Sequence, residues 1–142
     1  MEENKTQIRP AMVDGKLVGF NGYMGLEILE AENGHSKVKL PLKPEFFNHM
    51  GSLHGGVIYT MGDVAGGVAV RADGEDACTT MNSTIYFLSP SIGTETLYGE
   101  GEIVKHGRKT TTVDVNITDN TGKLVAKVMS TYFNLSADLK TK

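Results

Sequence analysis

One apolar stretch of this sequence combines a carboxylate with a cluster of glycines, and its residue types could do chemistry. The stretch "GSLHGGVIYTMGDVAGGVAVRA", residues 51–72, carries five glycines after Leu53 and a single carboxylate, Asp63. Glycine inside a helix costs about 1 kcal/mol relative to alanine, and burying an unpaired charge is expensive. Because function often offsets such costs, we interpret the stretch as a candidate catalytic site.

The residues before Asp63 have the features of a helix start that binds an anion. Apolar residues at three- and four-residue steps predict one long helix over residues 53–72, with Gly55 and Gly56 in its first turn. First-turn N–H groups lack acceptors within the helix and lie at the positive end of its dipole. A ligand oxygen can approach N–H groups that no side chain covers. The turn is therefore either an oxyanion hole or a tight loop that simply needs glycine.

The spacing of Gly55 and Asp63 favours a site shared by two chains. The two residues are eight positions apart, about 12 Å along a helix axis. A carbonyl bound at Gly55 is thus too far from Asp63 of the same chain. Gly62, Gly66 and Gly67 leave little side-chain bulk around Asp63, and we expect the same helix of a second subunit to pack there. Such a pair would supply two composite sites, in which Asp63 orients or deprotonates water. The alternative is an aspartate on the solvent face of the helix.

The elements around this helix predict an α+β fold. Asn33-Gly34 is a hairpin signal between two short alternating strands, and Pro41 and Pro44 end the second strand or put it at a sheet edge. Four further strands follow the helix as an antiparallel meander, so about six strands would wrap around the helix. We expect one domain over residues 1–142, with an N-terminal arm (1–19), extended or a short helix, and a core over about 20–135. Uncovered sheet edges favour oligomers. The four strands are expected in "ACTTMNSTIYFLSP", "TETLYGEGEIVK", "KTTTVDVNITD" and "KLVAKVMSTYFNL".

Composition narrows the class of protein. The formal net charge of -3 and the absence of long charged runs argue against a nucleic-acid binder. We find no signal peptide and no 18-residue apolar run, which predicts a cytoplasmic protein without membrane partners. The single cysteine, Cys78, excludes an intrachain disulfide and a cysteine-based zinc cluster, and fits a reducing compartment. His49 and His54 are poorly spaced as metal ligands, so we expect no metal.

Several other residues are weaker candidates for chemistry. We expect His54 to hydrogen-bond locally and fix the turn rather than act as a base, and Cys78 to be a small strand residue rather than a nucleophile. His35 and His106 fall in turns and are expected to face solvent. The sequence contains no serine-hydrolase elbow, dinucleotide fingerprint or phosphate loop. A basic turn could hold phosphates or simply be solvated; it consists of Lys105, His106, Arg108 and Lys109, with Arg71 as a further candidate.

The stretch "NHMGSLHGGVIYTMGD", residues 48–63, resembles the motif of the hotdog-fold acyl-CoA thioesterases, in their phenylacetic-acid-degradation (PaaI-like) branch. "NSTIYFLSP" and "EIVKHGRKTTTVDVNITDNTGKLVAKVMSTYF" are similar too, so the resemblance covers most of residues 45–134. It implies a sheet wrapped around one long central helix, and hydrolysis of an acyl-CoA to an acid and coenzyme A. It also implies no metal or redox cofactor, coenzyme A being part of the substrate. The family's sites lie between subunits, and its usual assemblies are homodimers paired into tetramers.

The resemblance also assigns roles to individual residues. Asp63 matches the catalytic carboxylate that positions or activates water, and the Gly55 N–H matches the group that polarises the thioester carbonyl. Asn48 matches the asparagine on the opposite wall, which orients the carbonyl or the water. His54 and Gly56 also match positions of the motif, and the resemblance implies a more structural role for them.

Two further assignments, and two competing functions, stay open at this point. Some relatives place a serine or threonine on the strand after the helix to assist the aspartate, and of Thr79 and Thr80 we prefer Thr80. Arg108, Lys109 and Arg71 are the candidates for holding the phosphates of coenzyme A. The first competitor is a hotdog hydratase or dehydratase, which needs an aspartate and a histidine close together. The second is a non-catalytic acyl-CoA-binding protein. The acyl group itself is not specified.

Overall fold

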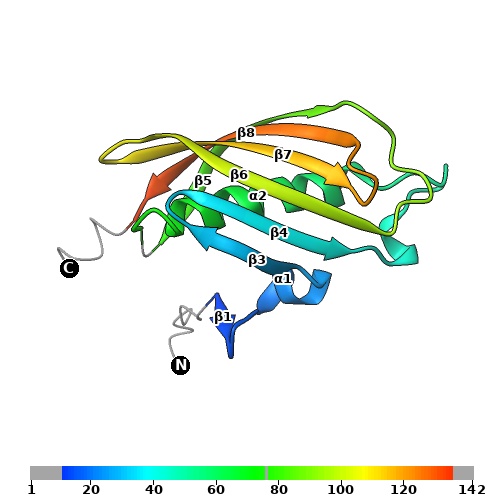
Figure 1. Cartoon of the computed structure of the whole chain (residues 1–142), viewed down its shortest axis with the longest axis horizontal. Helices are drawn as coiled ribbons and strands as arrows, with labels where there is room; N and C mark the ends of the chain where they lie inside the picture. The colour runs from blue at the N-terminus through cyan, green and yellow to red at the C-terminus, as the bar shows by residue number, and fades with distance from the viewer. Residues whose placement is uncertain (1–10, 76, 136–142) are drawn as a thin grey trace, which may run out of the picture.

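A curved antiparallel sheet encloses one long helix, α2 (Gly55–Arg71), in the computed structural model, which describes residues 11–75 and 77–135 (Figure 1). The sheet has six strands in the order β3-β4-β6-β7-β8-β5. The predicted α+β hotdog arrangement is thereby confirmed. The remaining elements are β1 (Met12–Val13), β2 (Lys16–Leu17), α1 (Gly19–Met24), β3 (Glu27–Glu32), β4 (His35–Pro41), the 3-10 turn η1 (Pro44–Phe46), β5 (Cys78–Phe87), β6 (Thr96–His106), β7 (Thr110–Asp119) and β8 (Leu124–Asn134).

The first hairpin forms where the sequence predicted it. Asn33 and Gly34 both have positive φ, 51° and 75°, as a tight turn between antiparallel strands requires. The turn pairs Glu32 with His35 and joins β3 to β4. Pro41 is the last residue of β4, and β4 lies between β3 and β6. Of the two expectations for this proline, strand termination is therefore right, and an edge position is wrong.

The order of the strands after the helix differs from the predicted meander. β6, β7 and β8 are consecutive neighbours, but β5 pairs with β8 at the far edge, and β6 pairs with β4. The connection from β5 to β6, residues 88–95, must therefore pass across the ends of β7 and β8. Its backbone is held there by the loop before α2, since Leu53 N–H donates to Ser91 O at 2.9 Å and Ser52 bridges to Ile92. This crossing segment covers the start of α2.

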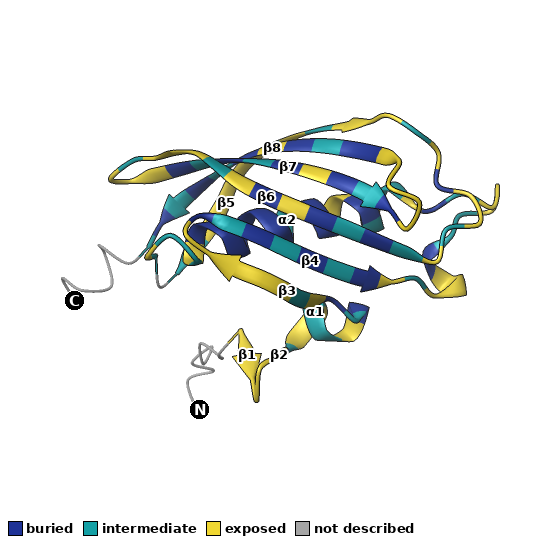
Figure 2. Ribbon diagram, viewed as in Figure 1, coloured by how far each residue is buried: buried dark blue, intermediate teal, exposed yellow. Residues whose placement is uncertain are grey.

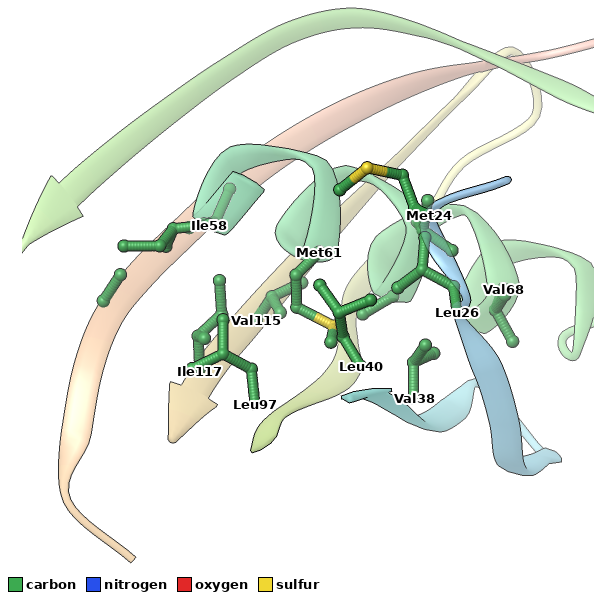
Figure 3. Packing of buried hydrophobic residues seen from close by; sticks show 14 of the residues in the cluster. Met24, Leu26, Val38, Leu40, Ile58, Met61, Val68, Leu97, Val115 and Ile117 are labelled. Carbon is green, nitrogen blue, oxygen red and sulfur yellow. The ribbon is translucent and has the colours of Figure 1, made fainter. Parts of the chain in front are cut away.

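Helix α2 is the centre of the core, with side chains of the sheet around it (Figure 3). Burial is nearly continuous along the helix from Met61 to Val70, with Asp63 half-buried (Figure 2). The strand pattern follows from alternation: in β7, Thr111, Val113, Val115 and Ile117 are all buried on the inner face.

The glycine face of α2 packs against its own chain, which corrects the expectation of a second helix there. A Cβ on Gly62 would stand 2.6 Å from Val128 Cγ2, and a Cβ on Gly66 would overlap the Tyr132 hydroxyl. Both partners lie on β8, which approaches the helix closely because these positions carry no side chain. A Cβ on Gly67 would meet the Tyr132 ring at 3.7 Å, an ordinary contact distance.

The predicted N-terminal arm contains regular structure in its described part. Residues 11–18 form a two-stranded ribbon, β1 with β2, and α1 begins at Gly19 and packs beside β3 (Figure 1). Residues 1–10 of the predicted arm lie outside the described part. Among the described helices, none has the length and apolar character needed to cross a bilayer.

Candidate active site

The start of α2 presents one backbone N–H without a partner. His54 is the N-cap, in extended conformation, and its Nδ1 accepts the Gly56 N–H at 2.9 Å. The Val57 N–H donates to His54 O at 3.0 Å. Among the described residues, Gly55 N–H has no acceptor. The local hydrogen bond expected of His54 is therefore present, and it leaves the Gly55 N–H free at the positive end of the helix dipole.

A hollow of about 300 Å³ lies beside this free N–H. It is formed where the crossing segment after β5 covers the first turn of α2. Apolar side chains dominate the lining, and Asp63 is not part of it. The lining residues are Ser52, Leu53, Gly55, Ile58, Phe87, Leu88, Ser89, Pro90 and Ser91.

Asp63 lies two turns further along α2 and is held by a threonine. The Thr80 hydroxyl on β5 donates to Asp63 Oδ1 at 2.6 Å. Of the two threonines that the sequence left open, the structure brings Thr80 to the carboxylate. Thr79 pairs with Phe133 in the sheet, and alternation directs its side chain to the opposite face from that of Thr80. One carboxylate oxygen is therefore fixed by the protein.

The backbone of Asp63 is fixed as well. The Tyr132 hydroxyl, from a side chain only 2 % exposed, donates to Asp63 O at 2.7 Å. Burial raises the pKa of this tyrosine, and the nearby Asp63 charge adds to the effect. Tyr132 therefore remains a neutral hydrogen-bond donor at ordinary pH. Burial also raises the pKa of the nearby Cys78 thiol, which disfavours the thiolate that a nucleophile needs.

Asn48 is engaged within its own loop. Its side-chain Oδ1 accepts the N–H of Met50 at 2.9 Å and the N–H of Ser52 at 3.2 Å. Its Nδ2 donates to Ser52 Oγ at 2.9 Å. The asparagine therefore shapes the turn that leads into α2.

The basic turn lies at the other end of the helix. Arg71 closes α2, sixteen residues from Gly55 and about 24 Å along the axis. Arg108 and Lys109 lie in the exposed turn between β6 and β7. A site that uses both the free N–H and this turn cannot draw them from adjacent parts of one chain.

His106, the last residue of β6, is exposed as predicted and also forms an ion-paired clamp. Its Nδ1 lies 2.6 Å from Asp73 Oδ2, and its Nε2 lies 2.7 Å from Glu75 Oε1. These hydrogen bonds, to Asp73 and then Glu75, raise the pKa of His106. The acidic pair therefore offsets part of the positive charge of the turn. His35 is held similarly, by Glu102 at 2.6 Å and Glu30 at 3.2 Å.

Two kinds of residue escaped the sequence analysis. Phe87 and the residues of the crossing segment line the hollow, and Tyr132 anchors the carboxylate-bearing turn of the helix. The signal for Phe87 was the run "NSTIYFLSP", which the resemblance included without giving any of its residues a role. Among the described residues, no cluster of three or more His, Cys, Asp or Glu is arranged to hold a metal ion.

Comparisons with known proteins place this chain in one family. Residues 50–126 match the model of the thioesterase superfamily. The chain therefore belongs to the thioesterase superfamily, and it is a thioester hydrolase. Its matched region contains the helix start, Asp63 and Thr80.

Individual relatives agree with this class. The acyl-coenzyme A thioesterase PaaI of Escherichia coli is 27% identical over 103 residues, covering 72% of this chain and 73% of its own. A "hypothetical thioesterase protein" of Streptococcus pneumoniae TIGR4, solved with coenzyme A, is 33% identical with a TM-score of 0.71, covering 76% of this chain and 84% of its own. A Streptococcus mutans UA159 protein, solved bound to acetyl CoA, is 28% identical with a TM-score of 0.72, covering 92% and 95%.

Proposed function

We propose that this protein hydrolyses acyl-CoA thioesters to a free acid and coenzyme A. The observation that carries the proposal is the free Gly55 N–H at the start of α2, on the same rigid helix as the Thr80-bound carboxylate of Asp63. Similarity to an E. coli acyl-CoA thioesterase and to proteins solved with coenzyme A or acetyl CoA supports the substrate class.

In the proposed reaction the thioester carbonyl oxygen accepts the Gly55 N–H. Asp63 orients a water molecule and takes its proton as the water oxygen attacks the carbonyl carbon. The resulting oxyanion is stabilised by the N–H and the helix dipole. Collapse of the tetrahedral intermediate breaks the carbon–sulfur bond, and the leaving thiolate of coenzyme A takes the proton that Asp63 accepted from water, which returns Asp63 to its carboxylate form. Asn48 and Gly56 shape the turn around the carbonyl.

The two groups come from different protomers in this proposal. Gly55 and Asp63 are about 12 Å apart along α2, beyond the reach of one carbonyl and its attacking water. β5 is the last strand of the sheet, and among the described strands none pairs with its far side. We propose that β5 pairs antiparallel with β5 of a second copy, which brings the two α2 helices alongside each other. Two such dimers would form the tetramer. Arg108 and Lys109 in the basic turn of the second copy, with its Arg71, would hold the coenzyme A phosphates. The lone free cysteine fits a reducing compartment, so we place the protein in the cytoplasm.

The arrangement of the histidines disfavours a hydratase. His35 and His106 are bound to glutamate or aspartate side chains away from Asp63. The composite site would bring His54 toward the partner's Asp63, but His54 Nδ1 accepts the Gly56 N–H, whereas a dehydratase needs a histidine beside the aspartate that is available for the reaction. The other alternative, a protein that binds acyl-CoA without hydrolysing it, is distinguished from the proposal by an assay of turnover.

The test is release of free thiol from a panel of acyl-CoA substrates. We expect wild-type turnover, and a fall in kcat of about a hundredfold or more in Asp63→Asn, since general-base catalysis contributes 10²–10⁴-fold. Asp14→Asn, an exposed aspartate in the N-terminal ribbon, is the matched control and should keep wild-type rates. Tight binding of acyl-CoA without turnover by the wild type would refute the proposal. So would full activity of Asp63→Asn.

The shared site is tested by mixing two inactive protomers. A heterodimer of Asp63→Asn with a Gly55 variant lacking the N–H, isolated by two affinity tags, contains one intact composite site. We expect about half of the wild-type activity per dimer. An inactive heterodimer would mean that each site is built from a single chain.

A further inference from the structure

Phe87 lies directly beside the free N–H of Gly55. A Cβ placed on Gly55 would stand 3.2 Å from Phe87 Cζ and 3.3 Å from Cε1, so the edge of the ring rests against the glycine. The ring is not part of the core, because the residue is 57% exposed. An aromatic ring that borders a candidate oxyanion donor and remains accessible is available to a substrate.

The register of the sheet explains why Phe87 points toward the site. Phe87 pairs with Ala126, which is fully buried on the inner face of the sheet. The preceding residue, Tyr86, pairs with Lys127 and therefore lies on the outer face. Two neighbouring aromatic residues of similar exposure, 60% for Tyr86, thus point to opposite faces. Of these two, Phe87 is the one that faces α2.

The chemistry of the hollow indicates which arm of a thioester enters it. Its side chains are chiefly apolar, with Leu53, Ile58, Leu88 and Pro90 beside Phe87, and neither lysine nor arginine lines it. The coenzyme A arm next to the sulfur is the pantetheine chain, whose amide groups need hydrogen-bond partners, and its phosphates lie further away and need cations, whereas the acyl arm is apolar. A hollow of about 300 Å³ is at the low end of the range for small-molecule sites. It suits a short or compact acyl group.

We infer that Phe87 is a specificity-determining residue, whose ring closes the acyl hollow beside the Gly55 N–H and selects short or compact apolar acyl groups over long chains. The inference rests on the proposed acyl-CoA hydrolysis and adds the substrate class. The Phe87 ring lies beside the position of the bound carbonyl. The first carbons of an acyl chain that extends from this carbonyl would therefore contact the ring.

The test is the acyl-length profile of kcat/KM, from acetyl-CoA to decanoyl-CoA, for wild type, Phe87→Leu and Phe87→Ala. We expect the ratio of kcat/KM for decanoyl-CoA over butyryl-CoA to rise by about tenfold or more in Phe87→Ala, and less in Phe87→Leu, because each accommodated methylene changes the rate by such factors. Tyr86→Ala is the matched control, and its ratio should stay at the wild-type value. Because each ratio is taken within one variant, it is insensitive to the amount of folded protein.

The outcomes separate this inference from the proposed function. An unchanged ratio in both Phe87 variants, with normal wild-type turnover, overturns the role of Phe87 and leaves acyl-CoA hydrolysis standing. The same shift in Tyr86→Ala as in Phe87→Ala also overturns it. Absence of wild-type turnover on every acyl-CoA overturns both. Should Phe87→Ala fail to fold, Phe87→Leu, which keeps an apolar side chain, carries the test.

Discussion

The Thr80 hydroxyl donates a 2.6 Å hydrogen bond to Oδ1 of Asp63 and so ties β5 to the middle of α2. The register of β5 shifts between Thr80 and Asn82, immediately beyond this contact. Bulges of this kind redirect side chains and are frequent next to active sites. One oxygen of the carboxylate is thereby fixed, which leaves Oδ2 as the oxygen that can accept from water.

Removing the Thr80 hydroxyl should slow the reaction without unfolding the protein. We expect kcat of Thr80→Val to fall by about tenfold or more, since a hydrogen bond to a charged group is worth about 1.5–3 kcal/mol. Thr80→Ser keeps the hydroxyl and should retain most activity. Thr79→Val, whose side chain is on the opposite face, should behave as wild type in steady-state assays. A larger loss in Thr79→Val than in Thr80→Val would contradict the assignment of Thr80.

Gly55→Pro should remove the proposed oxyanion donor and little else. Gly55 is the first residue of α2, where proline is well tolerated, and His54 already has the extended conformation that precedes proline. Loss of one such donor lowers kcat by about 10²–10³. Gly55→Ala is the control: its Cβ contacts Phe87 as the proline ring would, but its N–H remains. Equal kcat values for the two variants would rule out the N–H as the donor.

The proposed composite site would set the crossing point of the two helices. If Gly55 of one chain meets Asp63 of the other, the two-fold axis passes near residue 59, midway between them, and Tyr59 is exposed there. In a Cys78→Ser background, a short bis-maleimide should therefore join Tyr59→Cys protomers into covalent dimers, seen on a denaturing gel. Arg71→Cys is the control, since its two copies would be about 36 Å apart along the axis. Crosslinking at position 71 but not 59 would exclude this register.

Adjacent glycines of α2 should respond oppositely to alanine. Gly66→Ala forces a methyl group onto the Tyr132 hydroxyl, which is held by Asp63 O, and should cost about 1–3 kcal/mol of the free energy of unfolding. Gly67→Ala meets the Tyr132 ring at an ordinary 3.7 Å and gains helix propensity of up to about 1 kcal/mol. Urea unfolding of both variants measures the difference. Destabilisation of similar size in both would show that helix α2 and β8 pack differently from this description.

The His106 clamp should make stability depend on pH. Hydrogen bonds to Asp73 and Glu75 raise the pKa of His106 above its ordinary value of 6.5. A raised folded-state pKa means that the contribution is fully present below the ordinary pKa and is lost as the pH rises through the raised value. The urea midpoint of wild type should therefore exceed that of His106→Gln at about pH 6, and the gap should shrink by about pH 9.

The control for this clamp is His49→Gln, an exposed histidine in the loop before α2 without an ion pair among the described residues. Its urea midpoint should follow wild type throughout the same range. A gap for His106→Gln that does not change with pH would mean that the ring acts through packing alone.

The parts of the fold that were predicted from sequence are those with a local signal. Apolar periodicity located α2, Asn33-Gly34 located a hairpin, and alternation separated the two faces of β7. The motif that leads to Asp63 lies within sixteen consecutive residues, which is why its elements could be recognised together.

The features that were missed depend on contacts distant in sequence. Glycine at 62 and 66 indicated close packing, but the partners Val128 and Tyr132 are each sixty-six residues downstream, and no local pattern tells which element faces the helix. The position of β5 beside β8 was missed for the same reason. In the run "IYFL", all four residues are large and apolar, so alternation could not show that Phe87 faces the site.

The two edges of the sheet have unlike chemistry. β3 carries Glu27, Glu30 and Glu32, whereas no residue of β5 is charged. Like charges repel an incoming strand. If β5 pairs with β5 of a second copy as proposed, that pairing uses the same uncharged edge of both molecules. Growth into an endless sheet would then stop at the dimer, and a larger assembly would have to form through the faces of the paired sheets.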